Sequence, residues 1–78
     1  MKIATWNVNS IRARVEHVLG WMRELQPDVL LLQELKGAEF PALVFKELGY
    51  ENAAVTQKAY NGVAILSRFP IATINLNS

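Results

Sequence analysis

The sequence predicts an α/β fold, because two short apolar runs flank a stretch with helical periodicity near the start of the chain. The runs extend from Ile3 to Trp6 and from Asp28 to Gln33, and each is long enough for one strand. Between them, apolar residues recur at the spacing of one helix face, namely at Val15, Val18, Leu19, Met22 and Leu25. Two strands joined by a helix form a βαβ unit, in which the strands run parallel and the crossover is right-handed.

The ends of the first helix are marked by Ser10 and Pro27. Serine is a preferred N-cap, because its hydroxyl accepts a hydrogen bond from a free amide of the first turn. Pro27 stops the helix, since the residue before a proline is displaced from the α region. The second apolar run follows at once, and all but one of the residues from Val29 to Gln33 are apolar. A run this apolar is typical of a strand that is covered on both faces.

The second half of the chain is predicted to contain another helix and further strands. The helix extends from Glu39 to Leu48, where apolar residues again have helical spacing and Gly49 can end the last turn. Segments rich in strand-forming residues follow, at Tyr50–Thr56, Val63–Leu66 and Ile71–Leu76. The dipeptide Asn61-Gly62 precedes the second of these strands, and Asn-Gly often forms the tight turn of a hairpin.

The composition is that of one soluble globular domain. The 78 residues are 51% hydrophobic and carry a net charge of +1, whereas disordered chains are poorer in apolar residues and richer in net charge. The absence of cysteine excludes disulfides, a thiolate zinc site and a cysteine nucleophile. A net charge near zero means that any surface for nucleic acid must be local. Neither a signal peptide nor a membrane span of about 20 residues is present, so the expected location is the cytoplasm.

Glu34 is the strongest candidate for a functional side chain, because it comes directly after the second apolar run. Ligands of α/β sheets gather at the carboxyl ends of strands, and Mg²⁺ binds through one or two carboxylates together with the phosphate oxygens of a substrate. Asn7 ends the first strand in the same way. Because neighbouring strands are about 4.8 Å apart, both side chains are expected at one edge of the sheet, where they could contact one ion. The competing interpretation is an ordinary surface acid and a turn asparagine.

Four stretches of the chain are distinctive in sequence, namely Thr5–Ala13, Gln26–Val29, Leu32–Lys36 and Gln57–Ala64. In their order and spacing they resemble the amino-terminal part of the exodeoxyribonuclease III family of abasic-site endonucleases, within the endonuclease/exonuclease/phosphatase superfamily. Leu-Gln-Glu after an apolar strand is shared across the superfamily, whereas Asn-Val-Asn-x-Ile-Arg-Ala and Tyr-Asn-Gly-Val-Ala indicate the abasic-site branch. The resemblance implies the N-terminal portion of a four-layer α/β sandwich, in which helices flank two face-to-face sheets. Residues 1–78 are then expected to be the N-terminal part of one incomplete domain.

The resemblance also implies roles for single residues. Glu34 matches the metal-binding glutamate of the family, and Asn7 matches the asparagine beside the metal and the scissile phosphate. Asn9 stands where some members carry a carboxylate near the metal and is grouped with the DNA-binding positions, although it could instead help to cap the first helix. Three further positions match residues that approach the DNA backbone, namely Arg12, Lys36 and Tyr60. Without the resemblance, these would be solvated charges and a turn tyrosine.

Two positions depart from the commonest family pattern: Ser10 stands where glycine is usual, and Leu35 where threonine is usual. Neither change removes a metal ligand, so they bear on local backbone and packing. The family's catalytic histidine, the aspartate and asparagine that flank the attacking water, and a further tyrosine all lie beyond Ser78. His17 does not replace that histidine, because it lies inside the first helix, where a lone histidine is usually a solvated or half-buried residue.

Two functions remain open from the sequence. The first is a Mg²⁺-dependent DNA-repair nuclease, with Mn²⁺ as a possible alternative metal, that acts as an abasic-site endonuclease and 3′–5′ exodeoxyribonuclease. Its partner is double-stranded DNA with abasic sites or 3′ ends, it does not bind membranes, and the parent protein is expected to be a monomer. In that case the 78-residue chain alone is expected to be inactive. The second is a non-catalytic chain that acts at most as a weak binding or interaction module.

Overall fold

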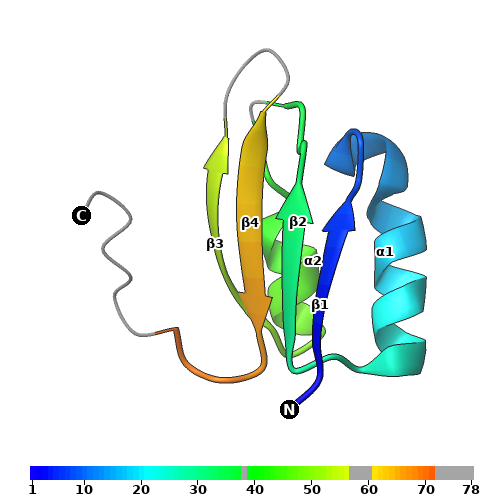
Figure 1. Ribbon diagram of the computed structural model, residues 1–78, viewed down its shortest axis with the longest axis vertical. Coiled ribbons are helices and arrows are strands. Elements are labelled where there is room, and N and C mark those ends of the chain that lie inside the picture. The colour runs from blue at the N-terminus through cyan, green and yellow to red at the C-terminus, as the bar shows by residue number, and fades with distance from the viewer. Residues whose placement is uncertain (38, 57–60, 72–78) are drawn as a thin grey trace.

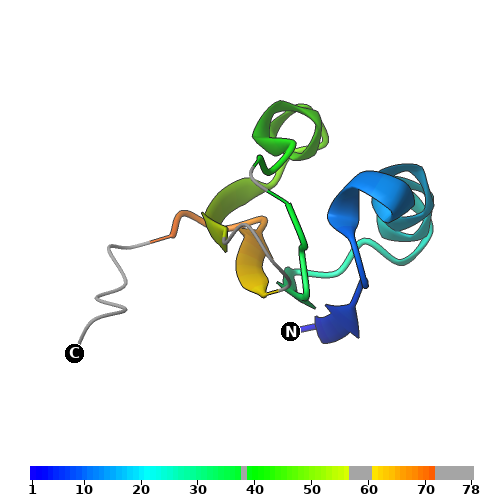
Figure 2. The same cartoon turned by 90° about the horizontal axis from the view of Figure 1, so that it is seen from above.

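The computed structural model describes residues 1–37, 39–56 and 61–71. Within them, two helices cover one face of a four-stranded sheet (Figures 1 and 2). In chain order the elements are β1 (Ile3–Asn7), α1 (Ile11–Leu25), β2 (Val29–Gln33), α2 (Ala42–Glu47), β3 (Glu51–Thr56) and β4 (Gly62–Ser67). This arrangement confirms the predicted α/β class.

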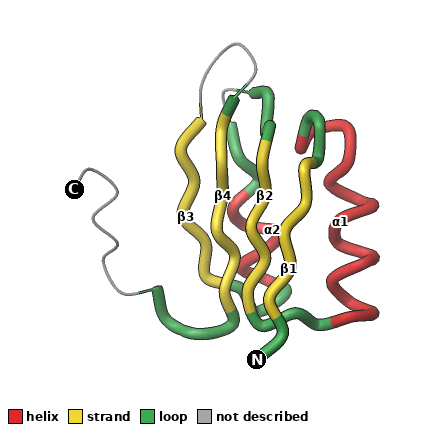
Figure 3. Tube along the Cα trace, in the orientation of Figure 1, coloured by secondary structure: helices red, strands yellow, loops and turns green. Residues whose placement is uncertain are grey.

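The sheet has the strand order β1-β2-β4-β3 (Figure 3). Strands β1 and β2 are parallel, with Ile3 opposite Val29 and Asn7 opposite Gln33. Strand β4 runs antiparallel to β2 and to β3. The predicted parallel pair joined by a helix is therefore confirmed, and the carboxyl ends of β1 and β2 lie at the same end of the sheet.

Helix α1 begins and ends where the sequence predicts. The hydroxyl oxygen of Ser10 accepts a hydrogen bond from the amide of Ala13 at 3.4 Å, as expected of an N-cap. At the other end, Gln26 leaves the helix with a left-handed φ of 47°, directly before Pro27. Helix α1 buries one face against the sheet, through Ile11, Val18, Leu19 and Met22.

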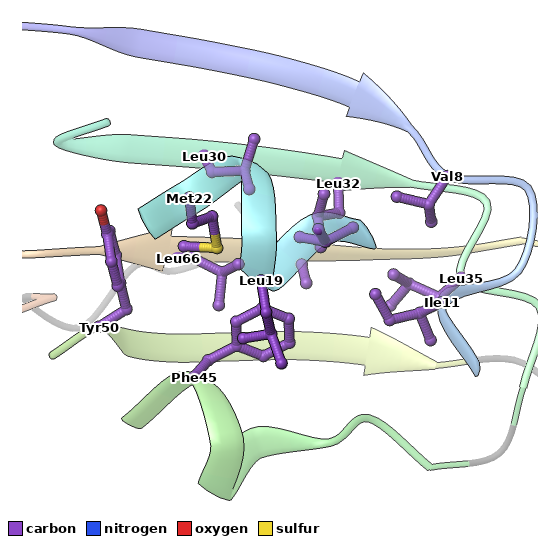
Figure 4. Close-up of a cluster of buried hydrophobic side chains, with 12 residues drawn as sticks. Val8, Ile11, Leu19, Met22, Leu30, Leu32, Leu35, Phe45, Tyr50 and Leu66 are labelled. Atoms are coloured by element: carbon purple, nitrogen blue, oxygen red, sulfur yellow. The ribbon is translucent and has the colours of Figure 1, made fainter. Parts of the chain in front are cut away.

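The hydrophobic core lies between the two helices and the covered face of the sheet (Figure 4). Strands β2 and β4 contribute Leu30, Leu32 and Leu66, and helix α2 contributes Phe45. Complete burial of such a side chain stabilises the fold by about 1.5–3 kcal/mol. Toward the end of the core that adjoins the carboxyl ends of β1 and β2, a smaller group is formed by Val8, Ile11 and Leu35 (Figure 4).

The second helix is shorter than the predicted range from Glu39 to Leu48, since α2 begins only at Ala42 and ends at Glu47. Pro41 occupies the N-cap position and makes no side-chain cap bond. Phe40, which precedes this proline, is displaced from the α region, and its ring stacks on that of Phe45 with the centroids 5.3 Å apart. Among the described residues, no helix is long and apolar enough to cross a membrane.

The predicted strand pair that follows α2 is confirmed, because β3 and β4 are antiparallel neighbours from Glu51–Ser67 to Thr56–Gly62. Residues 57–60, which connect them, lie outside the described residues. The last predicted strand, Ile71–Leu76, also falls outside them, apart from its first residue.

The expectation that β2 is covered on both faces is wrong for the part of the chain that the structure describes. Alternate residues of β2 are buried and half-buried, because α1 and α2 both pack on the same face of the sheet (Figure 2). On the other face, Ile3, Val55 and Val63 are 61%, 48% and 51% exposed. The described residues therefore form two layers, one of helices and one of strands, out of the four that the resemblance implies.

Candidate functional site

Asn7 and Glu34 lie together at the carboxyl ends of the two parallel strands. Figure 1 shows that β1 and β2 end at the same edge of the sheet. Asn7 is the last residue of β1, and Glu34 directly follows β2. The side-chain amide nitrogen of Asn7 donates a hydrogen bond to Oε2 of Glu34. The predicted juxtaposition is confirmed, and its cause is the pairing of adjacent parallel strands that end at the same level.

The loops after β1 and β2 contain four residues other than glycine with a left-handed backbone. Their φ angles are 48° at Asn9, 95° at Ser10, 56° at Glu34 and 51° at Lys36. Such conformations cost about 1–3 kcal/mol each and occur preferentially at functional sites. A backbone hydrogen bond of 2.9 Å from the amide of Ser10 to the carbonyl of Glu34 joins the two loops. The fold therefore uses backbone pairing to hold a strained arrangement at this edge.

Four polar side chains form one connected network on these loops. Nζ of Lys36 donates a hydrogen bond to Oδ1 of Asn9 and lies 3.7 Å from Oε1 of Glu34. The backbone amide of Asn9 donates to Oδ1 of Asn7 at 3.1 Å. Asn9 does not cap α1 through its side chain, so the interpretation of Asn9 as part of the polar cluster is the one that the geometry favours. The Lys36 and Glu34 side chains are 34% and 40% exposed, and the whole network faces solvent.

Arg12 lies beside this network in the first turn of α1 and is exposed. Within the described ranges, its side chain makes no hydrogen bond and no ion pair. Arg12 and Lys36 both line a groove of about 550 Å³ between the start of α1 and the segment before α2. Its other walls are formed by Ser10, Ile11, Val15, Gly37, Glu39, Phe40 and Pro41. Two cations at the rim of one groove can contact successive phosphates of a nucleic-acid backbone.

The donor set at this edge fits a magnesium ion that keeps most of its water. Mg²⁺ takes six oxygen ligands and is commonly held by one or two carboxylates plus substrate phosphate oxygens. Glu34 offers such a carboxylate, and the amide of Asn7 lies against it. Among the described residues there is no cluster of three or more histidine, cysteine or acidic side chains that could hold a metal by themselves. The remaining ligands would come from water and substrate.

His17 does not belong to this edge. Its ring packs edge-on against Trp6 on the side of α1, with the ring centroids 5.2 Å apart. Tyr60, the remaining predicted DNA contact, lies outside the described residues.

Sequence reasoning missed the support beneath the polar network. Nε2 of Gln33 donates a hydrogen bond of 2.7 Å to Oγ1 of Thr5 on the neighbouring strand. Thr5 and Asn7 are two residues apart and therefore lie on the same face of β1, and Gln33 ends β2 on that face. This spacing is visible in the sequence and could have predicted the bond between Gln33 and Thr5.

Comparisons with known proteins give a consistent result. Residues 4–77 match the family described as "Endonuclease/Exonuclease/phosphatase family". Exodeoxyribonuclease III of Haemophilus influenzae is 39% identical over 70 residues, which cover 87% of this chain and 26% of that protein.

Solved structures agree with the sequence comparison. The 3′ phosphatase NExo from Neisseria, bound to a product DNA hairpin, superimposes with a TM-score of 0.84 at 47% identity, over 87% of this chain and 27% of that chain. An AP endonuclease from Archaeoglobus fulgidus gives a TM-score of 0.84 at 46% identity, with the same coverage of 87% and 27%. The chain thus spans about a quarter of the length of the relatives it matches.

Proposed function

Because the chain belongs to the endonuclease/exonuclease/phosphatase family, we propose that it supplies the N-terminal part of a Mg²⁺-dependent DNA-repair nuclease. The activity is incision of duplex DNA at abasic sites and stepwise removal of nucleotides from 3′ ends. The observation that carries this proposal is the hydrogen-bonded pair of Asn7 and Glu34 at the carboxyl ends of β1 and β2. Support comes from the relatives, whose names describe an exodeoxyribonuclease, a 3′ phosphatase and an AP endonuclease.

Glu34 is the proposed metal ligand of this chain. A bound Mg²⁺ would polarise a phosphate oxygen and neutralise the charge that develops on the leaving oxygen. Mn²⁺, which prefers similar oxygen ligands, would substitute for it. The carboxylate of Glu34 now contacts the ammonium group of Lys36 and the amide of Asn7. With Glu34 holding a cation, the ammonium group of Lys36 could pair with a phosphate, while Asn7 would keep the carboxylate in place and orient the phosphate or a water beside it.

The DNA backbone is proposed to follow the cations beside this pair. Arg12 is exposed, and Lys36 shares a groove with it, so both can neutralise phosphates without giving up a buried contact. Asn9 holds Lys36 through its side-chain oxygen and thereby sets the direction of the ammonium group. Tyr60 remains a proposed DNA contact on the resemblance alone. The parent protein is proposed to act in the cytoplasm as a monomer.

Among the described residues, no histidine lies at the candidate site, because the ring of His17 packs against Trp6. We propose that the general base, which abstracts a proton from the attacking water, comes from the rest of the family domain. The 78-residue chain alone is accordingly proposed to be inactive.

The test is incision of a duplex that carries one abasic-site analogue, with Mg²⁺ or with EDTA. It compares the 78-residue chain with an extended form that carries the rest of a family domain. We expect Mg²⁺-dependent incision by the extended form and none by the chain alone. Glu24→Gln serves as the matched control for Glu34→Gln, because Glu24 is an exposed acid on α1. Metal-dependent incision by the pure 78-residue chain, or an extended form that is inactive on both abasic sites and 3′ ends, contradicts the proposal.

A further inference from the structure

Leu35 separates two residues of the polar network and is completely buried, with an exposed fraction of 0%. The residues on either side, Glu34 and Lys36, have left-handed φ angles of 56° and 51°. This alternation turns the side chains of Glu34 and Lys36 to solvent while that of Leu35 enters the core beside Val8 and Ile11 (Figure 4). The backbone strain at the two polar residues and the burial of Leu35 are thus parts of one conformation.

The backbone of Leu35 is hydrogen-bonded to two other parts of the chain. Its carbonyl accepts from the amide of Ile11 at 3.0 Å, which ties it to the start of α1. Its amide donates to the carbonyl of Gly62 at 3.2 Å, and the amide of Lys36 donates to Asn61 at 3.3 Å. The segment from Glu34 to Lys36 is therefore fixed between the β1–α1 loop and the start of β4.

Gly62 leaves the space that Leu35 fills. A Cβ atom on Gly62 would lie 3.1 Å from Cβ of Leu35 and 3.3 Å from the carbonyl oxygen of Val55. Gly62 also has a φ of 118°, which side-chain-bearing residues rarely adopt. Gly49 has a comparable φ of 99°, but a Cβ there would meet nothing within 4 Å. Of these two glycines, only Gly62 is constrained by contact with the segment that carries the candidate site.

We propose that Leu35 and Gly62 are positioning residues, which hold Glu34 and Lys36 in the left-handed conformation that directs their side chains to Asn7 and Asn9. The inference rests on the proposed function for its purpose, since these are the proposed metal and DNA contacts. Leu35 is completely buried and Gly62 has no side chain, so neither is proposed to contact substrate or metal. They act through the backbone: the buried side chain anchors the centre of the segment, and the close contact with Gly62 fixes its distance from β4.

A general role in stability is the competing explanation, and Leu30 distinguishes the two. Leu30 is also 0% exposed, yet it lies in regular β2, with strand neighbours on both sides. Truncation of Leu30 leaves a cavity in the core without touching the backbone of Glu34. Truncation of Leu35 leaves a cavity and also frees the anchored segment. Leu30→Ala is therefore the matched control for Leu35→Ala, and Gly49→Ala is the matched control for Gly62→Ala.

The first measurement is the NMR signal of the Asn7 side-chain amide in the 78-residue chain, which reports its hydrogen bond to Glu34. We expect the hydrogen-bonded signal to be lost in Leu35→Ala and Gly62→Ala. It should be retained in the two controls, Leu30→Ala and Gly49→Ala, and also in Leu35→Met, which conserves the side-chain volume. Where Leu35→Ala does not fold, Leu35→Val and Leu30→Val replace that pair. The proposal is overturned if the Asn7 signal is retained both in the folded Leu35 variant and in Gly62→Ala. It is also overturned if the controls lose the signal to the same extent.

The second measurement is the affinity for Mn²⁺, followed by paramagnetic broadening of the amides near Asn7 and Glu34. Residues that orient a metal ligand typically change affinity by about 10–100-fold, so we expect at least about a tenfold loss in Leu35→Ala and Gly62→Ala. The Leu30 and Gly49 controls should stay close to the original chain. If that chain binds no Mn²⁺ while the Asn7 signal still depends on Leu35 and Gly62, the positioning role stands and the proposed metal site fails.

Discussion

The two ends of the sheet are held together in opposite ways. We call the end where β1 and β2 begin the tied end, and it contains Lys2, Pro27, Asp28 and Tyr50. There the hydroxyl of buried Tyr50 donates a hydrogen bond to the carbonyl of Pro27 at 2.6 Å. The amide of Asp28 donates to the carbonyl of Lys2 at 2.8 Å, and its carboxylate accepts from the amide of Lys2 at 2.6 Å. At the opposite end, the site end (Asn7, Asn9, Glu34 and Lys36), the side-chain bonds are exposed, as is the bond from Lys2 to Asp28, and no described residue there makes a buried bond like that of Tyr50. Three residues of the site end have a left-handed φ, whereas beside the tied end only Gln26 does so among the described residues other than glycine.

The difference shows where this fold gains stability and where it gives stability up. A buried hydroxyl with a partner is costly to disrupt, because removal of the bond leaves a buried acceptor without a donor. An exposed polar network contributes little, since water replaces each partner. Three residues of the site end, Asn9, Glu34 and Lys36, instead keep left-handed conformations. That pattern is expected of a site that is preorganised for a ligand.

Tyr50→Phe should produce the largest stability loss among the polar contacts at either end. The change leaves the buried carbonyl of Pro27 without its donor, so the free energy of unfolding should fall by about 1–3 kcal/mol. Chemical denaturation of the 78-residue chain measures it. If Tyr50→Phe lowers the free energy of unfolding less than Asn7→Ala does, then the site end, and not the tied end, contributes more to stability.

The tied end should also make the free energy of unfolding fall at high pH. Burial raises the pKa of Tyr50 above its ordinary value of 10.0, and nearby Arg68 offsets part of that rise. Because the folded-state pKa is the higher one, the stabilisation is complete below pH 10.0 and is lost as the pH rises from there through the folded pKa. The pH dependence of unfolding should show this loss, and Tyr50→Phe should remove it. An unchanged alkaline slope in Tyr50→Phe would assign the loss to other groups.

Asn7→Ala at the site end should have a small effect on stability and a clear effect on the site. Asn7 is exposed, so loss of its bond to Glu34 should lower the free energy of unfolding by no more than about 1 kcal/mol. Mn²⁺ binding should weaken in the same variant. Denaturation and paramagnetic broadening, measured on one sample, separate the two effects, and an unfolded variant would show that the site end is structural after all.

Lys36→Gly should have the smallest effect on the free energy of unfolding, because two opposing contributions nearly cancel. Glycine relieves the left-handed strain at φ 51°, whereas loss of a partly exposed ion pair costs about 0.2–1 kcal/mol. We expect the free energy of unfolding to change by less than about 1 kcal/mol. A larger loss would mean that Lys36 anchors the loop. DNA binding by an extended form should weaken in the same variant.

The βαβ unit and the pairing of Asn7 with Glu34 could be predicted from sequence, because both follow from local patterns. Periodicity places α1 between two apolar runs, and parallel strands bring their carboxyl ends together. The roles of Leu35 and Gly62 could not be predicted. Leu35 reads as the continuation of an apolar strand, and Gly62 as a turn residue; their contact joins segments far apart in the chain.

Within the described residues, two predictions are wrong, namely that β2 is covered on both faces and that α2 extends from Glu39 to Leu48. The apolar content of β2 indicates burial but does not say which elements supply it, and both described helices pack on one face. Phe40 stands directly before Pro41, and a proline disfavours the α region for the residue before it, so α2 begins only at Ala42. The ring of Phe40 then stacks on that of Phe45. The start of α2 could thus have been predicted from Pro41, whereas the elements that cover β2 could not.

The claim that Glu34 holds the catalytic cation is tested most directly by the rate of abasic-site incision as a function of Mg²⁺ concentration. The measurement compares Glu34→Gln with Glu24→Gln in an extended form of the protein. Loss of the charge that holds the metal should cost about 3 kcal/mol of transition-state stabilisation, roughly 100-fold in rate at limiting Mg²⁺, while both variants remain folded. An unchanged rate for Glu34→Gln at limiting Mg²⁺ would contradict the claim and remove Glu34 from the site.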